Sequence, residues 1–368
     1  MPLIDGTNEY KVKILELTRS FYPSIGGMER FVADRLKIYE SLGFDYQVIT
    51  TNHSEKKITT ETLNDVIYLP SYTPYEIVPS IPNVMKNDYD VLSVNQLSYF
   101  YSYQAVNAAY GKGKKIILTP HLYFHTKKFK LIKDLHHKII VPRTLDKVDK
   151  IICFTEYETE FWKSNFPEAG NKIVVIPHYF SFDIEKISDT RNNYGKFFLF
   201  LGRGERNKRI DLLLKAFDKL DIEYQLVLTT SEDEISNELK NIVAKNKKIH
   251  LLGRVPEKEK QNLLATCEAL ILPTEFEAFG IVNFEASYFN KPLILSNLNV
   301  FKEILNAEGV IYFDNSVAAI RKAIQKLVVL KEEEKKKMGE INFLNLKNYS
   351  LEIIKEKYFN LFNELVNQ

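Results

Sequence analysis

Short apolar, β-branched runs alternate with amphipathic segments along almost the whole chain of 368 residues. This alternation is typical of repeated β-α units that build a parallel sheet, because each crossover between parallel strands needs a helix. The predicted strands of the first half are residues 12–17, 46–51, 66–69, 91–94, 116–119 and 151–154. After KIVVIP at 172–177 follow 197–201, 224–229, 249–252, 269–272, 293–295 and 310–313. Two successive doubly wound α/β domains are therefore expected.

The domain boundaries are expected in polar segments between these units. Residues 181–196 are polar, lack a clear period and contain Asn192-Asn193, which favours a linker. The last apolar residues, Leu351, Ile354, Tyr358, Leu361 and Leu365, are spaced by three and four, as in an amphipathic helix. We expect domains at 1–183 and 184–345, and a helix at 346–368 that crosses back to pack on the surface of the first domain.

Charge and cysteine content exclude several classes of protein. Fifty Lys plus Arg against 48 Asp plus Glu give a net charge of +2, which argues against a nucleic-acid-binding protein. The two cysteines, Cys153 and Cys267, lie far apart in apolar runs, as buried thiols do in a reducing compartment. Because no stretch reaches the length of apolar residues that a spanning helix needs, we expect a cytoplasmic protein.

One segment of the second half carries two carboxylates around a glycine turn. TEFEAFGIVNFEA, residues 274–286, follows the apolar run 269–272. If a helix begins near Gly280, Glu277 lies in the loop before it and Glu285 lies one to two turns into it. The free N–H groups of the first helical turn form an anion site suited to phosphate. Carboxylates around such a site suggest a sugar nucleotide, although a solvated loop with one exposed acid has the same pattern.

A second loop joins a strand to a helix in FFLFLGRGERNKRIDLLLKAF, residues 197–217. Its first apolar run is typical of a strand buried on both faces, and its end has the spacing of an amphipathic helix. Ligands of open parallel sheets bind at the carboxyl ends of the strands, where this loop is expected. Arg203 and Lys208 can therefore neutralise a diphosphate, although a surface loop with helix-flanking charges is the alternative.

The first half contributes a glycine pair and a histidine. Gly26 and Gly27 follow the first predicted strand, where paired glycines let the backbone approach a ligand closely. His121 follows the strand 116–119 and is placed either to contact a sugar hydroxyl or a reacting centre, or to cap the strand. Neither the glycine pair nor the Gly-x-Gly at Gly202 completes a three-glycine dinucleotide fingerprint, which argues against an NAD enzyme.

No pattern in the sequence demands a metal. Asp88-Tyr89-Asp90 precedes a predicted strand instead of ending one, so we interpret it as a turn. His125, His136 and His137 lack the spacing of a zinc site. We therefore expect neither a metal nor another cofactor.

The order of these motifs resembles the retaining glycosyltransferases of the GT-B fold, family 4. The resemblance rests on G-G-x-E at residues 26–29, on G-R with a lysine five positions beyond the arginine, and on E-x7-E in an E-x-F-G setting. It spans nearly the whole chain and is strongest from 202 to 297. It implies a retaining hexosyltransferase whose acceptor-binding domain, 1–183, and sugar-nucleotide-binding domain, 184–345, are Rossmann-like and face a central cleft.

The resemblance also implies roles for individual residues. Glu285 would bind the ribose hydroxyls of the donor, and Glu277 would bind a hydroxyl of the transferred sugar. Arg203 and Lys208 would hold the diphosphate, and His121 would flank the anomeric carbon. Further donor-binding positions would be Gly26, Gly27, Gly202, Arg254, Val255, Phe279, Gly280 and Ile281.

Sugar transfer of this kind leaves a dianionic nucleoside diphosphate while positive charge builds on the sugar. Fixed cations and helix-terminus amides in a water-poor cleft stabilise that leaving group without a metal. The family implies retention, with attack on the leaving-group face and a phosphate oxygen as base. The chain departs from the common family pattern at 93–96, at 176–179 and at Arg209, which bears on the sugar and the acceptor more than on the reaction.

The acceptor is suggested by a basic span. Residues 112–150 carry eleven Lys or Arg against three Asp, and from 123 to 150 they are interleaved with apolar residues. Such a span suits an anionic membrane face or a lipid-linked diphosphate, and it equally suits a soluble helix with one buried face. We hypothesise a UDP- or GDP-sugar donor and a glycan or lipid-linked glycan acceptor at the cytoplasmic membrane face. Two alternatives stay open, a sugar-nucleotide epimerase or hydrolase on the same fold and an inactive carbohydrate- or membrane-binding protein.

Overall fold

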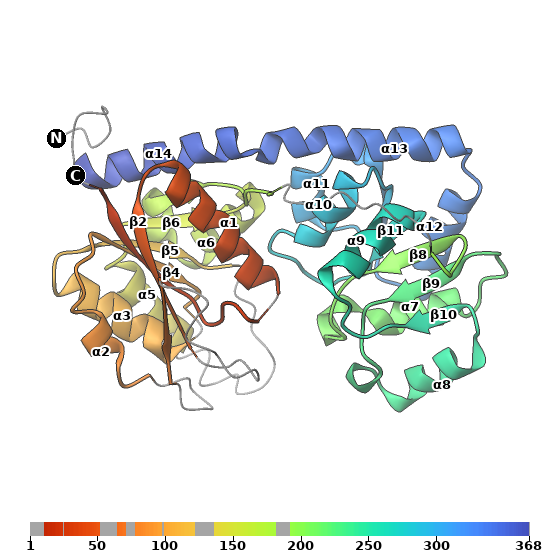
Figure 1. Ribbon diagram of the computed structural model, residues 1–368, viewed down its shortest axis with the longest axis horizontal. Coiled ribbons are helices and arrows are strands. Elements are labelled where there is room, and N and C mark those ends of the chain that lie inside the picture. Colours follow the sequence, from red (N-terminus) through yellow and green to blue (C-terminus); the bar gives the residue numbers. More distant parts are fainter. Residues whose placement is uncertain are drawn as a thin grey trace. The chain divides into compact units, whose positions relative to one another are not determined.

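The structure is a computed structural model that describes residues 11–24, 26–51, 65–70, 78–97, 99–121, 136–181 and 192–367. It divides into two compact units, each built on one parallel sheet (Figure 1). The first unit combines Met1–Tyr179 with Tyr349–Gln368, and the second is Phe180–Asn348. The expected two α/β sheets are confirmed. Most of the expected linker lies outside the described residues.

The first sheet has the strand order β3-β2-β1-β4-β5-β6-β7. Its strands are β1 (Lys13–Leu17), β2 (Asp45–Thr51), β3 (Val66–Leu69), β4 (Val91–Asn95), β5 (Lys115–Thr119), β6 (Lys150–Cys153) and β7 (Ile173–Val175). Its helices are α1 (Gly27–Ser41), α2 (Ile81–Val84), α3 (Phe100–Tyr110), α5 (Val141–Leu145), α6 (Glu156–Asn165) and α14 (Leu351–Asn367), with a π-helical turn at His136–Ile140 and a 3-10 turn at Pro167–Lys172. Helices α1 and α14 lie on one side of the sheet, and α2 and α3 lie on the other (Figure 1).

The second sheet repeats this order as β10-β9-β8-β11-β12-β13. Its strands are β8 (Phe197–Phe200), β9 (Gln225–Leu228), β10 (Ile249–Leu251), β11 (Ala269–Leu272), β12 (Leu293–Ser296) and β13 (Val310–Phe313). Its helices are α7 (Ile210–Phe217), α8 (Asn237–Lys245), α9 (Glu257–Thr266), α10 (Ile281–Tyr288), α11 (Asn299–Ile304), α12 (Val317–Val328) and α13 (Glu332–Asn345). Short 3-10 turns lie at Arg206–Lys208, Glu232–Glu234 and Ala307–Gly309, and another, Leu346–Tyr349, lies between α13 and α14.

The predicted strands are all present, with ends that differ by at most two residues. They are apolar throughout because helices cover both faces of a parallel sheet, and the whole of β8 is buried. In each sheet the chain reverses its winding direction next to the first strand, between β1 and β4 and between β8 and β11. Open α/β sheets bind ligands at such switch points, outside the carboxyl ends of the strands. A ligand-binding site is therefore expected in the loops that follow these four strands.

The C-terminal residues form the amphipathic helix that their spacing predicts, and this helix packs on the first unit. Ile354, Tyr358, Leu361 and Leu365 are all buried. The ring of Phe362 lies 4.9 Å from that of Phe44, next to the end of α1. The apolar face of α14 is therefore part of the core of the first unit.

Candidate functional site

Two loops meet at the carboxyl edge of the second sheet, because β8 and β11 are neighbouring parallel strands. The loop after β8 carries the cations predicted from the sequence, and the loop after β11 carries Glu277. A direct hydrogen bond ties them together, from the Glu275 amide to the Asn207 carbonyl oxygen at 2.7 Å. The hydroxyl of Thr274 donates to the same oxygen at 3.3 Å.

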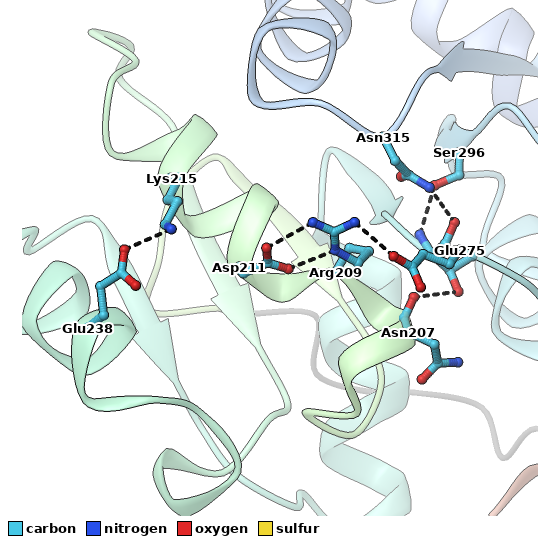
Figure 2. A network of polar contacts seen from close by, with 9 residues as sticks. Asn207, Arg209, Asp211, Lys215, Glu238, Glu275, Ser296 and Asn315 are labelled. Carbon is cyan, nitrogen blue, oxygen red and sulfur yellow. Dashed lines mark hydrogen bonds and ion pairs between the residues drawn. The ribbon is translucent and has the colours of Figure 1, made fainter. Parts of the chain in front are cut away.

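Arg209 strengthens this connection (Figure 2). Its guanidinium donates to both carboxylate oxygens of Asp211, each at 3.0 Å, and to Glu275 at 2.9 Å. Arg209 has φ 45° and ψ 37°, in the left-handed region that favours glycine over residues with a side chain. The left-handed backbone at Arg209 is strained for a residue with a side chain, but the guanidinium at this position bridges the two loops.

A ring of hydrogen bonds holds the start of the β11 loop to the next two strands (Figure 2). The Thr274 amide donates to the Ser296 hydroxyl at the end of β12, at 2.8 Å. That hydroxyl donates to Asn315 after β13, and the Asn315 amide group returns to the Thr274 carbonyl oxygen, each at 2.8 Å. Thr274 and Ser296 are fully buried, so the loop leaves the sheet in one fixed direction.

Lys208 and Glu277 form an ion pair between the two loops. Both side chains are largely buried, with 18% and 16% exposed. Lys208 ends the 3-10 turn Arg206–Lys208, and Glu277 lies three residues before Gly280. The structure thus brings together a cation and a carboxylate that the sequence placed 69 residues apart.

Gly280 sets the start of α10. It lies at φ 77°, and a Cβ on it would come within 2.7 Å of the Asn283 amide nitrogen and 2.9 Å of the Phe301 ring. Phe279 is buried and stacks on Phe284, with ring centroids 4.7 Å apart. Ile281 is the first helical residue, so the backbone amides expected to cradle a phosphate belong to a rigidly packed turn.

Glu285, in the second turn of α10, is held by a lysine that the sequence analysis missed. Lys260 on α9 lies 2.7 Å from the Glu285 carboxylate and 2.9 Å from Glu257. Burial alone would lower the pKa of Lys260, but the two carboxylates outweigh it and raise that pKa. Lys260 therefore stays charged and fixes the Glu285 carboxylate.

The other predicted donor-binding residues of this unit lie at the same edge of the sheet, and the two arginines among them are exposed. Arg203 follows β8, is 78% exposed and pairs with Glu205 at 3.0 Å. Gly202 receives a hydrogen bond on its carbonyl oxygen from Thr230 at 3.0 Å. Arg254, which is exposed, and Val255 follow β10, after a glycine with φ 68°.

In the first unit, Gly26 and Gly27 begin α1 after β1. The carboxylate of Glu29 folds back over Gly26, so that a Cβ there would lie 2.7 Å from its oxygen. Ser20 donates a hydrogen bond to the same carboxylate. A carboxylate thus already faces this helix start, which favours contact with a neutral hydroxyl-rich group over contact with a phosphate.

His121 follows β5 at φ 53°, and its Nε2 atom lies 3.2 Å from Asn95 Oδ1 at the end of β4. Its ring packs edge-on against Phe31 and Phe154, with centroids 4.7 and 5.1 Å away. Burial, together with Arg35 and His178, holds the pKa of His121 well below its ordinary value. His121 is a neutral hydrogen-bonding group in this setting.

The remaining expectations concern metals, cysteines and the basic span. Asp88 pairs with Lys13 near the amino ends of β1 and β4, at the edge of the first sheet opposite the one where Gly26 and His121 follow their strands. Within the described ranges, no three His, Cys, Asp or Glu side chains come together in a way that could hold a metal ion. Cys153 and Cys267 are buried and form no disulfide. His125 and most of the span 123–150 lie outside the described residues, as do the side chains of His136 and His137.

Comparison with known proteins places these elements in a family. The family described as "Glycosyltransferase Family 4" matches residues 25–180, and "Glycosyl transferases group 1" matches residues 182–343. An uncharacterized glycosyltransferase of Methanocaldococcus jannaschii is 24% identical over 328 residues, covering 87% of this chain and 89% of that protein. The GDP-mannose:cellobiosyl-diphosphopolyprenol alpha-mannosyltransferase of Xanthomonas oryzae is 23% identical over 340 residues, covering 86% and 88%.

Solved structures agree on the fold. Sucrose-phosphate synthase from Thermosynechococcus elongatus superposes with a TM-score of 0.78 at 16% identity, over 97% of this chain and 100% of that one. Anabaena HepE in complex with UDP and glucose gives a TM-score of 0.77 at 15% identity, over 96% and 100%. The two family matches together span most of the chain, and the chain belongs to the family 4 glycosyltransferases of the GT-B fold.

Proposed function

We propose that this glycosyltransferase moves a hexose from a UDP- or GDP-sugar to a glycan or lipid-linked glycan, with retention of the anomeric configuration and without a metal. The supporting observation is the pair of lysine-held carboxylates on one βα segment, Lys208 with Glu277 and Lys260 with Glu285, on either side of the amides that begin α10. The Xanthomonas oryzae relative, whose name includes GDP-mannose and mannosyltransferase, favours GDP-mannose as the first donor to test.

The proposed roles follow from these contacts. Lys208 and Arg203 hold the diphosphate, with the amides of Gly280 and Ile281 facing the same charge. Lys208 then exchanges Glu277 for the more highly charged phosphate, which releases Glu277 to bind a sugar hydroxyl. Glu285 stays with Lys260 and accepts hydrogen bonds from the ribose hydroxyls.

Nucleoside diphosphate binding tests the donor site directly. Thermal unfolding is measured with GDP, UDP, ADP and NAD for the natural protein, for Glu285→Gln and for Glu257→Gln. A ligand at a hundred times its dissociation constant stabilises the folded protein by about 2.7 kcal/mol, so one nucleoside diphosphate should raise the melting temperature. Glu285→Gln should lose this rise, because an amide accepts the ribose hydroxyls less well than a carboxylate.

Glu257→Gln is the matched control, since Glu257 pairs with the same lysine but lies at the start of α9. It should keep the rise. The proposed donor site would be disproved if no nucleoside diphosphate raised the melting temperature, or if both variants lost this rise equally. Product analysis with the stabilising sugar nucleotide then separates transfer to an acceptor from epimerisation or hydrolysis, and the anomeric configuration of the product tests retention.

We further propose that a lipid-linked acceptor is met at the cytoplasmic face of a membrane. None of the helices in the described part of the chain is long and apolar enough to cross a bilayer. The turn His136–Ile140 exposes 37% of Ile139 and 40% of Ile140 beside the exposed Lys138. Exposed apolar residues next to a cation suit contact with anionic lipid.

Sedimentation with vesicles tests this contact. The protein should pellet with phosphatidylglycerol vesicles at low salt and not with phosphatidylcholine vesicles, because the attraction is partly electrostatic. The double variant Ile139→Ser/Ile140→Ser should weaken pelleting, while Val329→Ser, which changes a 79% exposed apolar residue of the second unit, should not. Equal pelleting of all three proteins would argue against a membrane contact at this turn.

A further inference from the structure

A charged pair is buried inside the first unit, directly behind His121. Glu16 on β1 and Arg35 on α1 form an ion pair, with 0% and 1% of their side chains exposed. Tyr39 donates to the second oxygen of Glu16 at 3.2 Å, and Arg35 also donates to the Thr119 hydroxyl at 2.8 Å. Burying two charges costs desolvation free energy that is recovered only when their hydrogen-bonding partners are in place. A buried ion pair is therefore weak evidence for stability alone.

Asn95 connects the pair to His121, and its partners define how its side-chain amide is oriented. Its nitrogen lies 2.6 Å from the Glu16 carboxylate and 3.0 Å from the Leu17 carbonyl oxygen, which are both acceptors. Its oxygen lies 2.6 Å from an Arg35 nitrogen, which can only donate. The reversed amide would direct N–H groups at the guanidinium and an oxygen at the carboxylate, so one orientation satisfies all three partners.

The orientation of Asn95 determines the tautomer of His121. Asn95 Oδ1 carries no proton, and His121 Nε2 lies 3.2 Å from it, so Nε2 must carry the proton of this hydrogen bond. A neutral imidazole has one N–H, and its other nitrogen is then an acceptor. His121 Nδ1 is therefore left with a lone pair.

The surroundings of the ring keep it neutral. Burial lowers the pKa of His121 most, and Arg35 on α1 and His178 after β7 lower it further. Burial, with Arg30 and Arg35, also lowers the pKa of His178 to about 3. The Glu16 carboxylate is bonded to Arg35, Tyr39 and Asn95, and Asn95 lies between it and the ring.

We propose that Asn95 is a positioning residue that holds His121 as the neutral tautomer protonated on Nε2, so that Nδ1 accepts a hydrogen bond from a carbohydrate hydroxyl. The buried Glu16–Arg35 pair serves to orient Asn95. The substrate part of this inference rests on the proposed function, and the tautomer does not. His121 then selects a sugar that carries the hydroxyl and takes no part in proton transfer, which leaves that task to a phosphate oxygen.

Nuclear magnetic resonance of the histidine ring nitrogens reads the tautomer without any substrate. The full chain is labelled with ¹⁵N-histidine, and the signal of His121 among the seven histidines is assigned by its loss in His121→Gln. The expected spectrum has a protonated Nε2 and a bare Nδ1, unchanged between about pH 5 and 8, the range in which an ordinary histidine titrates. A proton on Nδ1, or titration near the ordinary pKa, would overturn the proposal.

Two variants test the role of Asn95. Asn95→Ala should give a mixture of tautomers, since the acceptor that selects the Nε2–H form is gone. Thr119→Val removes another hydrogen bond to Arg35 and none of the side-chain hydrogen bonds of Asn95, its neighbour on β4, and it should leave the His121 spectrum unchanged. A folded Asn95→Ala protein with the natural spectrum would overturn the proposal, and should that variant not fold, the spectrum of the natural protein still decides.

This experiment also separates the inference from the proposed function. A protein that fails to bind any nucleoside diphosphate but shows the expected ring spectrum disproves the donor site and leaves the tautomer standing. With a donor in hand, a deoxy sugar nucleotide lacking the selected hydroxyl should lose kcat/KM in the natural protein, by the large factor typical of a site built around that hydroxyl. In His121→Phe the two donors should differ little, and an equal difference in both proteins would overturn the substrate part.

Discussion

Lys208→Met is expected to lower kcat/KM for sugar transfer about 10² to 10³-fold, the loss typical when one fixed group that stabilises a developing negative charge is removed. In the proposed reaction the leaving diphosphate gains charge, and Lys208 is a largely buried cation in the loop after β8. The variant also leaves Glu277 without its ion-pair partner. Initial rates with the donor identified by thermal stabilisation give the measurement.

Lys219→Met is the matched control, because Lys219 is an exposed lysine just beyond the end of α7, the helix that follows Lys208. It should keep the natural rate. The same assay with and without a chelator tests metal independence, and the rate should not change. A Lys208→Met protein that folds, binds the donor and turns over at the natural rate would remove Lys208 from the mechanism.

Arg35→Met is expected to lower the free energy of unfolding of the first unit by about 3–5 kcal/mol, as found when one partner of a buried ion pair is removed. Glu16 would lose its cationic partner in a site that is fully buried, with Tyr39 and Asn95 as its remaining donors. The single tryptophan, Trp162, is buried in the same unit, so its fluorescence reports urea unfolding of that unit.

The double variant Glu16→Leu/Arg35→Met should recover most of the lost stability, because an apolar pair of similar volume is often as stable as a buried ion pair. Lys37→Met, a half-exposed position on the same helix that lies 4.0 Å from Asp34 and not in the Glu16–Arg35 pair, should change little. If Arg35→Met unfolded at the natural urea concentration, the pair would contribute nothing to folding. A double variant that is stable but shows a changed His121 spectrum would identify orientation of Asn95 as the reason for keeping the charges.

The sequence predicted the sheets well because each buried strand carries its own signal. The two loops of the second unit could also be located, since each follows a strand and contains several charged residues or glycines. The ion pairs between side chains that lie far apart in the sequence could not be predicted. Lys260 looks like any helix lysine in EKEK, and only the fold brings it to Glu285, 25 residues later.

The charged network behind His121 does leave a signal in the sequence. Glu16 is a lone acid inside the apolar strand run 12–17, and Arg35 lies four residues after Phe31 on the buried face of α1. A charge in each of two buried elements suggests that they pair. The role of Asn95 depends on hydrogen bonds to three other elements, which no local pattern contains.

The first unit is completed by residues from both ends of the chain, since α14 joins it after the whole of the second unit has been made. During synthesis the N-terminal sheet emerges first, yet Phe44 and Tyr39 lack Phe362 and Tyr358 until the last helix is added. Domains generally fold as units in the order in which they leave the ribosome. Here the first unit needs α14, which is translated after the second unit. The part of the chain that is translated first therefore completes its core last.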